Sequence, residues 1–411
     1  METYGECKDE KDEDVYYWCN TSEEYYKVLE WIPYDKFYDF EYIAKGGFGK
    51  VYRTIWIDGY IRYWDDINQN WERPFPEKDV ALKSLNNSKN VKLEFINEIT
   101  SHHKIFGDNY GTIIRLYGIT QDPDTKNYMM VLYYAENGSL RNYLDTNVKL
   151  SWRDKIYHLC DIANGLEQIH ANELIHRDLH IGNILYTYKP MITDMGLCKP
   201  ADYNATENTK NSTYGVLPYI APEILRGQNY TKAADIYSFG IIMYEVISGL
   251  PPYHDVSHNQ NLALKICQGL RPRFDIKVPQ LFVHLIKRCL DANQLNRPTA
   301  SEIIHILRYK FDDSTELERQ VKEADEMNNN KLQTSYVTLT SLSYETHSEA
   351  IYTSRLLNFN NLPEPKNSDD YYKYYDNIIS TEYSENLQID ISQLKINEND
   401  QNDESKGEEI I

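Results

Sequence analysis

The stretch LIHRDLHIGNIL at 174–185, followed by ITDMGL at 192–197, decides the fold of this chain. It places Asp178, Asn183 and Asp194 between apolar segments that are typical of β-strands. Carboxylate and amide oxygens suit Mg²⁺, and a carboxylate can also accept the proton of a hydroxyl group. One such acid alone could be a structural cap, but three of these groups within 17 residues are not a solvated charge run. The stretch therefore predicts a site for a metal ion and a reacting hydroxyl.

A glycine cluster lies upstream, in EYIAKGGFGKVY at 41–52. Gly46, Gly47 and Gly49 fall between two segments with strand-like alternation, where glycine would let the backbone approach a phosphate closely. On its own this is weak, because many glycine-rich hairpins are only turns.

Lys83 and Glu98 extend the same hypothesis. Lys83 ends the short strand VALK at 80–83, and Glu98 lies on an amphipathic helix predicted over 91–105. A lysine facing this glutamate could hold its ammonium group beside phosphates. Taken in isolation, a plain surface ion pair is the simpler interpretation.

The order of the predicted elements indicates an α+β protein. Strands are predicted at 41–52, 80–83, 113–119 and 128–134, a long polar loop at 58–79, and helices at 139–146, 151–170, 232–249, 260–268, 279–290 and 300–309. Strands thus come first and helices second, which favours a sheet-rich N-terminal part and a helical C-terminal part.

Charge separates the chain into three regions. Of the net charge of −20, residues 1–30 carry −7, residues 31–310 carry +1 and residues 311–411 carry −14. A nearly neutral centre argues against nucleic-acid binding and against docking on an anionic membrane. No apolar run is long enough for membrane insertion, and the six scattered cysteines favour reduced thiols in the cytoplasm, with the nucleus not excluded.

In these motifs and their order the chain resembles the eukaryotic protein kinases over residues 38–309. Three further motifs are similar to the tyrosine-kinase-like branch of the family: ENGSLRNYL (136–144), DIYSFGIIMYEVISGLPPY (235–253) and GLRP (269–272). The sequence as a whole is also similar to the expanded kinase sets of some fungi. The resemblance implies a bilobal fold with a five-stranded sheet and one main helix in the N-lobe (38–135) and a mainly helical C-lobe (136–309). The kinase domain then spans 31–310, between a flexible leader (1–30) and a largely disordered tail (311–411).

The resemblance also implies a role for each motif residue. The catalytic group would comprise Asp178 as the base, Lys83 on the α- and β-phosphates, its partner Glu98, and Asn183. Mg²⁺ would be held by Asn183 and Asp194. ATP would lie against Ala44, Lys45, Gly46, Gly47, Phe48, Gly49, Val51, Ala81, Lys83, Leu132, Tyr133, Ala135, Leu185 and Asp194. Structural roles would fall to Asp235, which braces the catalytic loop, and to a pair between Glu223 and Arg297.

Four departures from the family pattern matter. Ala44 replaces the first loop glycine, which predicts weaker but present ATP affinity. Met195 replaces a phenylalanine, and His102 stands where an apolar residue packs with Leu116, His176 and Met195. His180 and Val216 replace a lysine and a threonine that contact each other in serine/threonine kinases. The acceptor is therefore open between serine or threonine, which we favour, and tyrosine.

Two alternatives to an active kinase remain: a pseudokinase that binds nucleotide or partners without phosphotransfer, and a functional tail that the kinase domain regulates. Within the tail, YTSRLLNFNNLPEP (352–365) is apolar enough to dock as a short motif. The expected partners are a protein substrate and an upstream activating kinase. Arg177 would bind a phosphate on the segment between Asp194 and Glu223, at one of Thr206, Thr209, Ser212, Thr213 and Tyr214, with Ser212 and Thr213 preferred.

Overall fold

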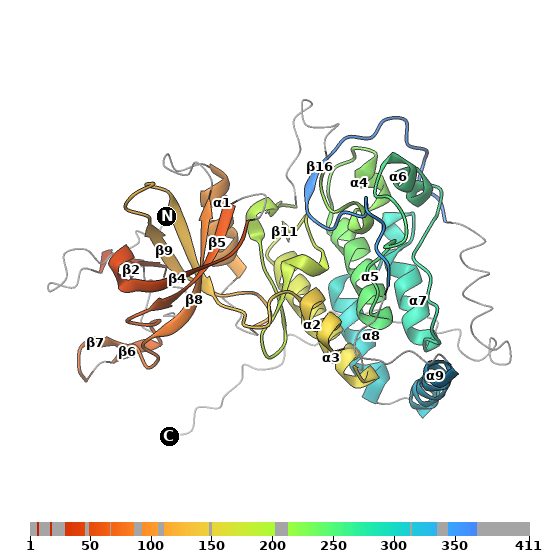
Figure 1. Cartoon of the computed structure of the whole chain (residues 1–411), viewed down its shortest axis with the longest axis horizontal. Coiled ribbons are helices and arrows are strands. Elements are labelled where there is room, and N and C mark those ends of the chain that lie inside the picture. The colour runs from red at the N-terminus through yellow and green to blue at the C-terminus, as the bar shows by residue number, and fades with distance from the viewer. Residues whose placement is uncertain are drawn as a thin grey trace, which may run out of the picture.

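The computed structural model describes residues 6–7, 17–18, 29–45, 49–65, 67–85, 93–105, 111–147, 150–201, 213–312, 315–334 and 344–367. They form a sheet-rich lobe and a helical lobe joined side by side (Figure 1). This is the bilobal α+β fold that the sequence predicts. Most of the leader, Gly46, Gly47 and Phe48 lie outside the described residues.

The N-lobe is built on one six-stranded sheet. Its strands, in spatial order, are β3 (Glu30–Trp31), β9 (Leu116–Gln121), β10 (Tyr128–Tyr133), β8 (Lys78–Leu85), β5 (Gly49–Trp56) and β4 (Phe37–Lys45). The last five are antiparallel and correspond to the predicted five-stranded sheet, whereas the two-residue β3 adds a parallel edge.

Alternation along β8 decides which side chains face the catalytic side. Val80 and Leu82 are fully buried in the cluster that includes Trp56 on one face of the sheet. Ala81 and Lys83 consequently point to the other face, since side chains alternate along a strand. That face is covered by α1 (Leu93–Ile105), whose Ile99 packs in a second cluster.

The region 58–79 is not the polar loop that we predicted. It contains a hairpin of β6 (Tyr63–Asp65) and β7 (Asn70–Glu72), and β8 already begins at Lys78. The indole rings of Trp64 and Trp71 meet edge to face across the hairpin, with centroids 5.0 Å apart. Aromatic cross-strand packing stabilises this pair of strands although its flanking residues are polar. A further strand pair, β1 (Glu6–Cys7) with β2 (Tyr17–Trp18), lies in the leader.

The C-lobe packs its helices around α5. These helices are α2 (Leu140–Thr146), α3 (Trp152–Ala171), α4 (Pro222–Leu225), α5 (Lys232–Ser248), α6 (Gln260–Cys267), α7 (Gln280–Cys289) and α8 (Ala300–Asp312). Residues Ala234 to Ile247 of α5 are all buried, so this helix is the centre of the lobe. Short strand pairs carry the catalytic loop: β11 (Leu174–Ile175) with β14 (Lys199–Pro200), and β12 (Ile184–Tyr186) with β13 (Pro190–Ile192).

The structure describes two main parts of the tail, which we predict to be largely disordered. Helix α9 (Thr315–Thr334) follows α8, and its Leu317 and Ala324 are buried against the C-lobe. Farther on, β16 (Arg355–Leu357) pairs with β15 (Thr213–Gly215) of the C-lobe. The expectation that 352–365 can dock as a short motif is confirmed.

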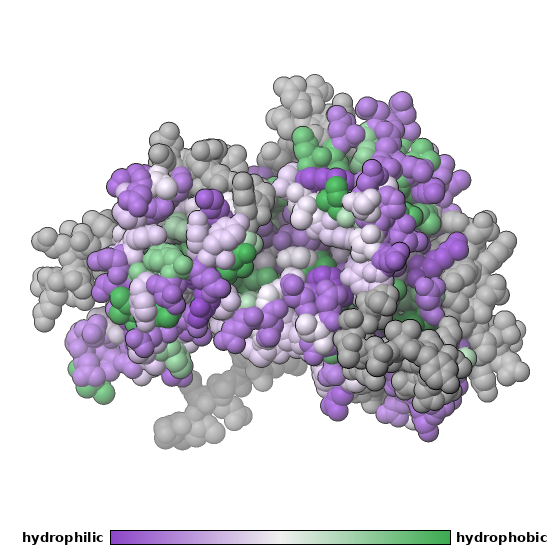
Figure 2. Space-filling model, viewed as in Figure 1, coloured by the Kyte–Doolittle hydropathy of each residue, from purple (hydrophilic) through white to green (hydrophobic). Residues whose placement is uncertain are grey.

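Hydrophilic and hydrophobic residues are mixed on the face of the molecule shown in Figure 2. On the side shown in Figure 2 hydrophilic residues predominate, and hydrophobic ones are scattered in small groups. Among the described residues, the structure contains no helix with the length and apolar character needed to cross a bilayer.

Candidate active site

Asp235 of α5 holds the catalytic loop from below. Its carboxylate accepts hydrogen bonds from the backbone amides of His176 (2.8 Å) and Arg177 (3.0 Å) and lies 3.0 Å from His170 Nε2. Arg177 has φ of 71°, a conformation that a non-glycine residue adopts only when its surroundings impose it. The buried carboxylate of Asp235 therefore stabilises the turn that presents Asp178, as the sequence predicts.

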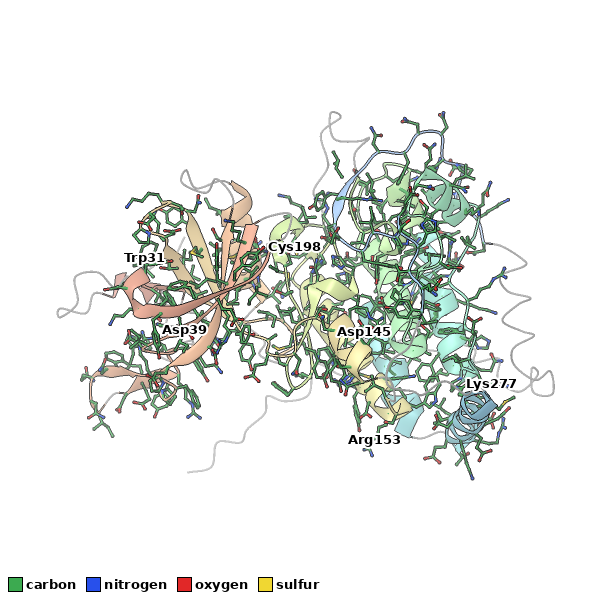
Figure 3. All side chains as sticks on the ribbon, viewed as in Figure 1. Trp31, Asp39, Asp145, Arg153, Cys198 and Lys277 are labelled. Carbon is green, nitrogen blue, oxygen red and sulfur yellow. The ribbon has the colours of Figure 1, made fainter. Side chains whose placement is uncertain are left out.

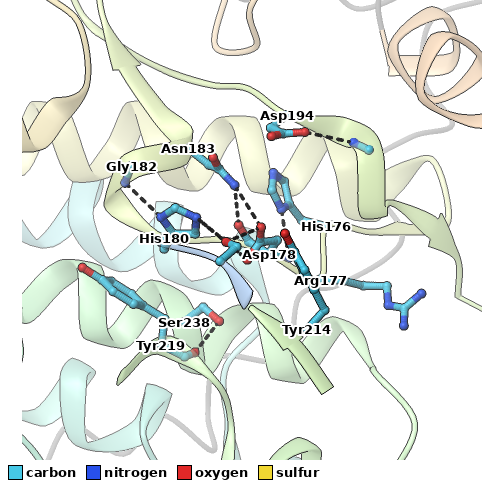
Figure 4. Close-up of polar contacts among 12 residues, drawn as sticks. His176, Arg177, Asp178, His180, Gly182, Asn183, Asp194, Tyr214, Tyr219 and Ser238 are labelled. Carbon is cyan, nitrogen blue, oxygen red and sulfur yellow. Dashed lines mark hydrogen bonds and ion pairs between the residues drawn. The ribbon is translucent and has the colours of Figure 1, made fainter. Parts of the chain in front are cut away.

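Asp178 lies at the centre of a polar cluster (Figure 4). The Asn183 amide donates to the Asp178 carbonyl over 2.9 Å, and the Ser354 hydroxyl lies 2.9 and 2.7 Å from the two carboxylate oxygens. Burial raises the pKa of Asp178 to about 6, although the bonds from Ser354 and Asn183 act in the opposite direction. A carboxylate with this pKa can accept a proton near neutral pH.

Lys83 forms ion pairs with two carboxylates, one in each lobe. Its Nζ lies 2.7 Å from Glu98 Oε1 on α1 and 2.8 Å from Asp194 Oδ1. Burial acts to lower the pKa of Lys83, but the neighbouring Asp194 and Glu98 outweigh it, so the pKa is raised and the ammonium persists. Sequence reasoning paired Lys83 with Glu98 and missed its direct bond to Asp194.

Asp194 is itself held in an unusual conformation. Its φ of 62° is left-handed, and its carboxylate accepts a bond from the Gly196 amide over 3.3 Å. Burial would raise the pKa of Asp194, but the Lys83 ammonium outweighs burial and holds the pKa below its usual value. Asp194 therefore remains ionised.

The donor set fits Mg²⁺ bound together with a phosphate ligand. The Asn183 amide nitrogen donates to Asp178, so its carbonyl oxygen would be the atom to bind a metal ion, and Asp194 would contribute a carboxylate. Within the described ranges no group of three or more His, Cys, Asp or Glu side chains could hold a metal ion. One carboxylate, one amide and substrate phosphates are a usual Mg²⁺ environment.

Several of the residues predicted to lie against ATP are found where the two lobes meet. Ala81 and Leu185 both pack against the cluster that contains Leu132, and Leu132 pairs directly with Ala81 between β10 and β8. The Tyr133 amide donates to Arg115, so only its carbonyl would remain for adenine, beside the amide of Ala135. In the glycine-rich loop, Ala44 pairs with Val51 across β4 and β5, and Lys45 pairs with Lys50.

His102 lies on α1, one turn after Glu98. It is 2% exposed, and its Nδ1 has no hydrogen-bond partner within the described structure. Burial lowers the pKa of His102 to about 3, so the imidazole is neutral. Met195 is fully buried, which agrees with the prediction that it fills the place of phenylalanine. The neutral imidazole of His102 thus packs as a nearly apolar side chain. Helix α1 keeps the position in which Glu98 forms its ion pair with Lys83.

His180 lies directly beside Asp178. Its ring lies beside that of Tyr219, with centroids 5.9 Å apart and planes inclined by 52°, and both line a small cavity together with Val216. Burial lowers the pKa of His180 to about 4. The paired replacement noted in the sequence therefore puts a neutral ring and an apolar side chain where a lysine and a threonine would be expected.

The activation segment is described only in part. Thr206, Thr209 and Ser212 lie outside the described residues. Thr213, one of two preferred phosphorylation sites, is 7% exposed and its hydroxyl donates to the Ile224 carbonyl over 2.9 Å. In this conformation its hydroxyl is buried and bonded, so phosphorylation of Thr213 would require this part of the activation segment to rearrange.

Arg177 directly precedes Asp178 in the catalytic loop, and Cys198 lies four residues after Asp194. The Arg177 guanidinium lies over the Tyr230 ring at 4.6 Å, and its buried Nε has no partner in the described structure. Cys198 lies at the lobe junction (Figure 3), 2% exposed, and burial raises the pKa of its thiol. A buried thiol with a raised pKa is unreactive and packs as a small apolar side chain.

Ser354 is the functional candidate that sequence reasoning missed. It lies within the stretch predicted to dock, but no local pattern distinguishes it from the chain's other serines. Its position becomes evident only from the contact with Asp178, 176 residues earlier.

Comparisons with known proteins agree with this geometry. The family model for protein tyrosine and serine/threonine kinases matches residues 39–307. A probable serine/threonine-protein kinase of Dictyostelium discoideum is 27% identical over 280 residues, which cover 66% of this chain and 19% of that protein. A probable LIM domain-containing serine/threonine-protein kinase of the same organism is 30% identical, covering 68% of this chain and 40% of the relative.

A tyrosine-protein kinase of Girardia tigrina is 26% identical over 268 residues, covering 62% of this chain and 50% of the relative. The chain thus spans between 19% and 50% of the length of these three relatives. The range matched by the family model, 39–307, contains the glycine-rich loop, the catalytic loop and Asp194. The chain belongs to the protein tyrosine and serine/threonine kinase family.

Proposed function

We propose that this chain is an active protein kinase that transfers the γ-phosphoryl group of ATP to a protein hydroxyl, with serine or threonine favoured over tyrosine. The observation that carries the proposal is the position of Lys83, bonded to both Glu98 and Asp194. In the family this arrangement accompanies phosphotransfer. A module that had lost catalysis would not need these three charges buried together.

Each residue then has a stated task. Lys83 contacts the α- and β-phosphates, Asn183 and Asp194 hold Mg²⁺, and Asp178 accepts the hydroxyl proton. Bound Mg²⁺ would neutralise phosphate charge as it develops. Positioning accounts for most of the catalysis, since phosphoryl transfer requires little covalent chemistry from the protein.

The partners we propose are a protein substrate and an upstream activating kinase. Cys198, Cys267 and Cys289 are buried and form no disulfide within the described structure. Free thiols are typical of a reducing compartment, and we propose the cytoplasm, or the nucleus, as the location.

The test is phosphotransfer from γ-labelled ATP by the full chain to a mixture of generic protein substrates, followed by phosphoamino-acid analysis. Labelled serine or threonine is the expected product. The matched control is Asp178→Asn, which keeps the shape of the side chain but removes the base. A Tm that rises with Mg²⁺-ATP without any phosphotransfer would instead identify a pseudokinase.

A further inference from the structure

Residues 344–367, here called the docked segment, lie along the C-lobe, where Figure 1 shows β16 and the chain after it beside α4 and α6. Near its start, the amide of His347 donates to the His254 carbonyl over 2.8 Å. Near its end, the amide of Lys366 donates to the Cys267 carbonyl over 3.1 Å. Backbone bonds thus fix both ends of the segment.

The middle of the docked segment adds a strand to the activation segment. Gly215 pairs with Arg355 and Thr213 pairs with Leu357, in antiparallel register. Leu357 is 5% exposed and belongs to the C-lobe core, whereas its neighbour Leu356 is 67% exposed. Strand addition with alternate side chains in pockets is a recognised way of binding an extended peptide.

Two further side chains on either side of Ser354 are held by the C-lobe. The Tyr352 hydroxyl donates to the Pro252 carbonyl over 2.9 Å, and its ring meets His258 edge to face at 4.9 Å. The Arg355 guanidinium donates to the His258 carbonyl over 2.6 Å. The chain on both sides of Ser354 is therefore fixed, and its hydroxyl is delivered to one place.

That place is between His180 and Asp178. The Gly182 amide donates to His180 Nδ1 over 3.1 Å, so this nitrogen carries no proton. The neutral ring must then carry its proton on Nε2, which lies 3.1 Å from Ser354 Oγ and donates to it. The serine proton is consequently directed to Asp178, at 2.7 Å.

We propose that the docked segment is an intramolecular substrate and that Ser354 is its phosphate acceptor, an inference that rests on the proposed kinase function. A bond forms between Ser354 Oγ and the γ-phosphorus of ATP. The bond from that phosphorus to the bridging oxygen breaks, and ADP leaves with the electron pair. The hydroxyl proton passes to Asp178 and then to water.

The product disfavours the docked state. A phosphoserine at 354 carries about −1.5 to −2 charge at pH 7 and would face the Asp178 carboxylate. Repulsion in this buried setting releases the segment and opens the cleft to other substrates. Before modification the segment covers the base, so the unmodified chain is slow toward other proteins.

The first measurement is mass spectrometry of the purified, dephosphorylated full chain after incubation with Mg²⁺-ATP. Phosphate on Ser354 is expected in wild type and in Thr353→Ala, whose side chain is exposed and adjacent. Ser354→Ala should lose this modification, and Asp178→Asn should gain none. Label on external substrates with none on Ser354 overturns this inference and leaves the kinase function intact. No label on either overturns both.

Concentration distinguishes transfer within one molecule from transfer between molecules. The first-order rate of Ser354 phosphorylation should stay constant over a 100-fold dilution of the chain. Wild-type chain mixed with tagged Asp178→Asn should leave the tagged chain unmodified. A rate proportional to concentration, or modification of the tagged chain, overturns intramolecular transfer.

The two neighbouring leucines give a matched test of docking. Leu357→Asp puts a charge into the apolar core contact, whereas Leu356→Asp places the same charge on an exposed position of the same strand. Leu357→Asp should slow Ser354 phosphorylation at least tenfold. In wild type, transfer to an external peptide should begin with a slow phase that lasts until the segment is released, and Leu357→Asp should remove that slow phase. Leu356→Asp should resemble wild type in both assays. Equal behaviour of the two variants overturns the proposal that the docked segment occupies the substrate site.

Discussion

Arg297 and Glu223 form a parallel two-bond ion pair in the C-lobe: Nη1 lies 2.6 Å from Oε1 and Nη2 lies 2.8 Å from Oε2. The Arg297 side chain is fully buried, and it also donates to the Ala233 and Asp291 carbonyls. This confirms the pair predicted from the sequence. It ties the end of the activation segment to the loop before α8.

Glu223→Ala should destabilise the chain by about 3–5 kcal/mol, because it leaves the Arg297 charge buried without its partner. Arg297→Ala should cost a similar amount, measured by urea unfolding. The double variant should cost less than the sum of the two single variants, since each removes the same pair. Additive losses would mean that the two residues act independently.

Lys83→Met and Asp178→Asn should each lower phosphotransfer by about 10²–10⁴-fold. The two differ in binding: Lys83→Met removes the ammonium at the phosphates, whereas Asp178→Asn retains it. Measured with a nucleotide titration, ATP affinity should fall more in Lys83→Met. Near wild-type turnover in Asp178→Asn would show that another base acts.

His180→Phe keeps a ring against Tyr219 but removes the proton donor to the acceptor hydroxyl. A single hydrogen bond contributes about 0.5–1.5 kcal/mol, so we expect kcat for Ser354 transfer to fall about 2- to 12-fold. The Kd for ATP should not change. An unaltered kcat would show that His180 does not orient the hydroxyl.

His102→Leu should stabilise the chain, since it replaces a buried imidazole whose Nδ1 has no partner in the described structure. The gain should depend on pH. The folded pKa is about 3, below the unfolded value of about 6.5, so the unfolded state binds more protons between these values. Wild type therefore loses stability as pH falls below about 6.5, and the leucine variant loses less. A difference in Tm that is equal at pH 5 and pH 8 would contradict this.

The sequence predicted the elements whose signals are local. Each of these signals depends on residues that are close together in the sequence. They are the catalytic motifs, the alternation along β8 and the helical spacing of the C-lobe, and the structure contains all three. The β6–β7 hairpin was missed because its stability comes from Trp64 against Trp71 rather than from an apolar run. Helix α9 was not predicted because the high net charge and sparse apolar residues of this region obscure the helical spacing of Leu317, Val321 and Ala324.

The site shows the same division. Lys83, Glu98, Asp178, Asn183 and Asp194 were identified from motifs, and His180 was singled out as a departure. Its consequence could not be predicted, because the partner of His180 is Ser354, which lies 174 residues away. Pairing of two short strands across that separation depends on tertiary packing and leaves no periodic signal.

The pairing of β15 with β16 also fixes how far Ser354 lies along the chain from the paired residues. Each residue of an extended chain advances by about 3.3 Å, which is close to the reach of one hydrogen bond. A single residue inserted between Ser354 and Arg355 would leave Leu357 in its pocket but carry the hydroxyl out of contact with Asp178. The strand pair thus determines which position along the docked segment reaches Asp178, irrespective of how many other hydroxyl groups lie nearby.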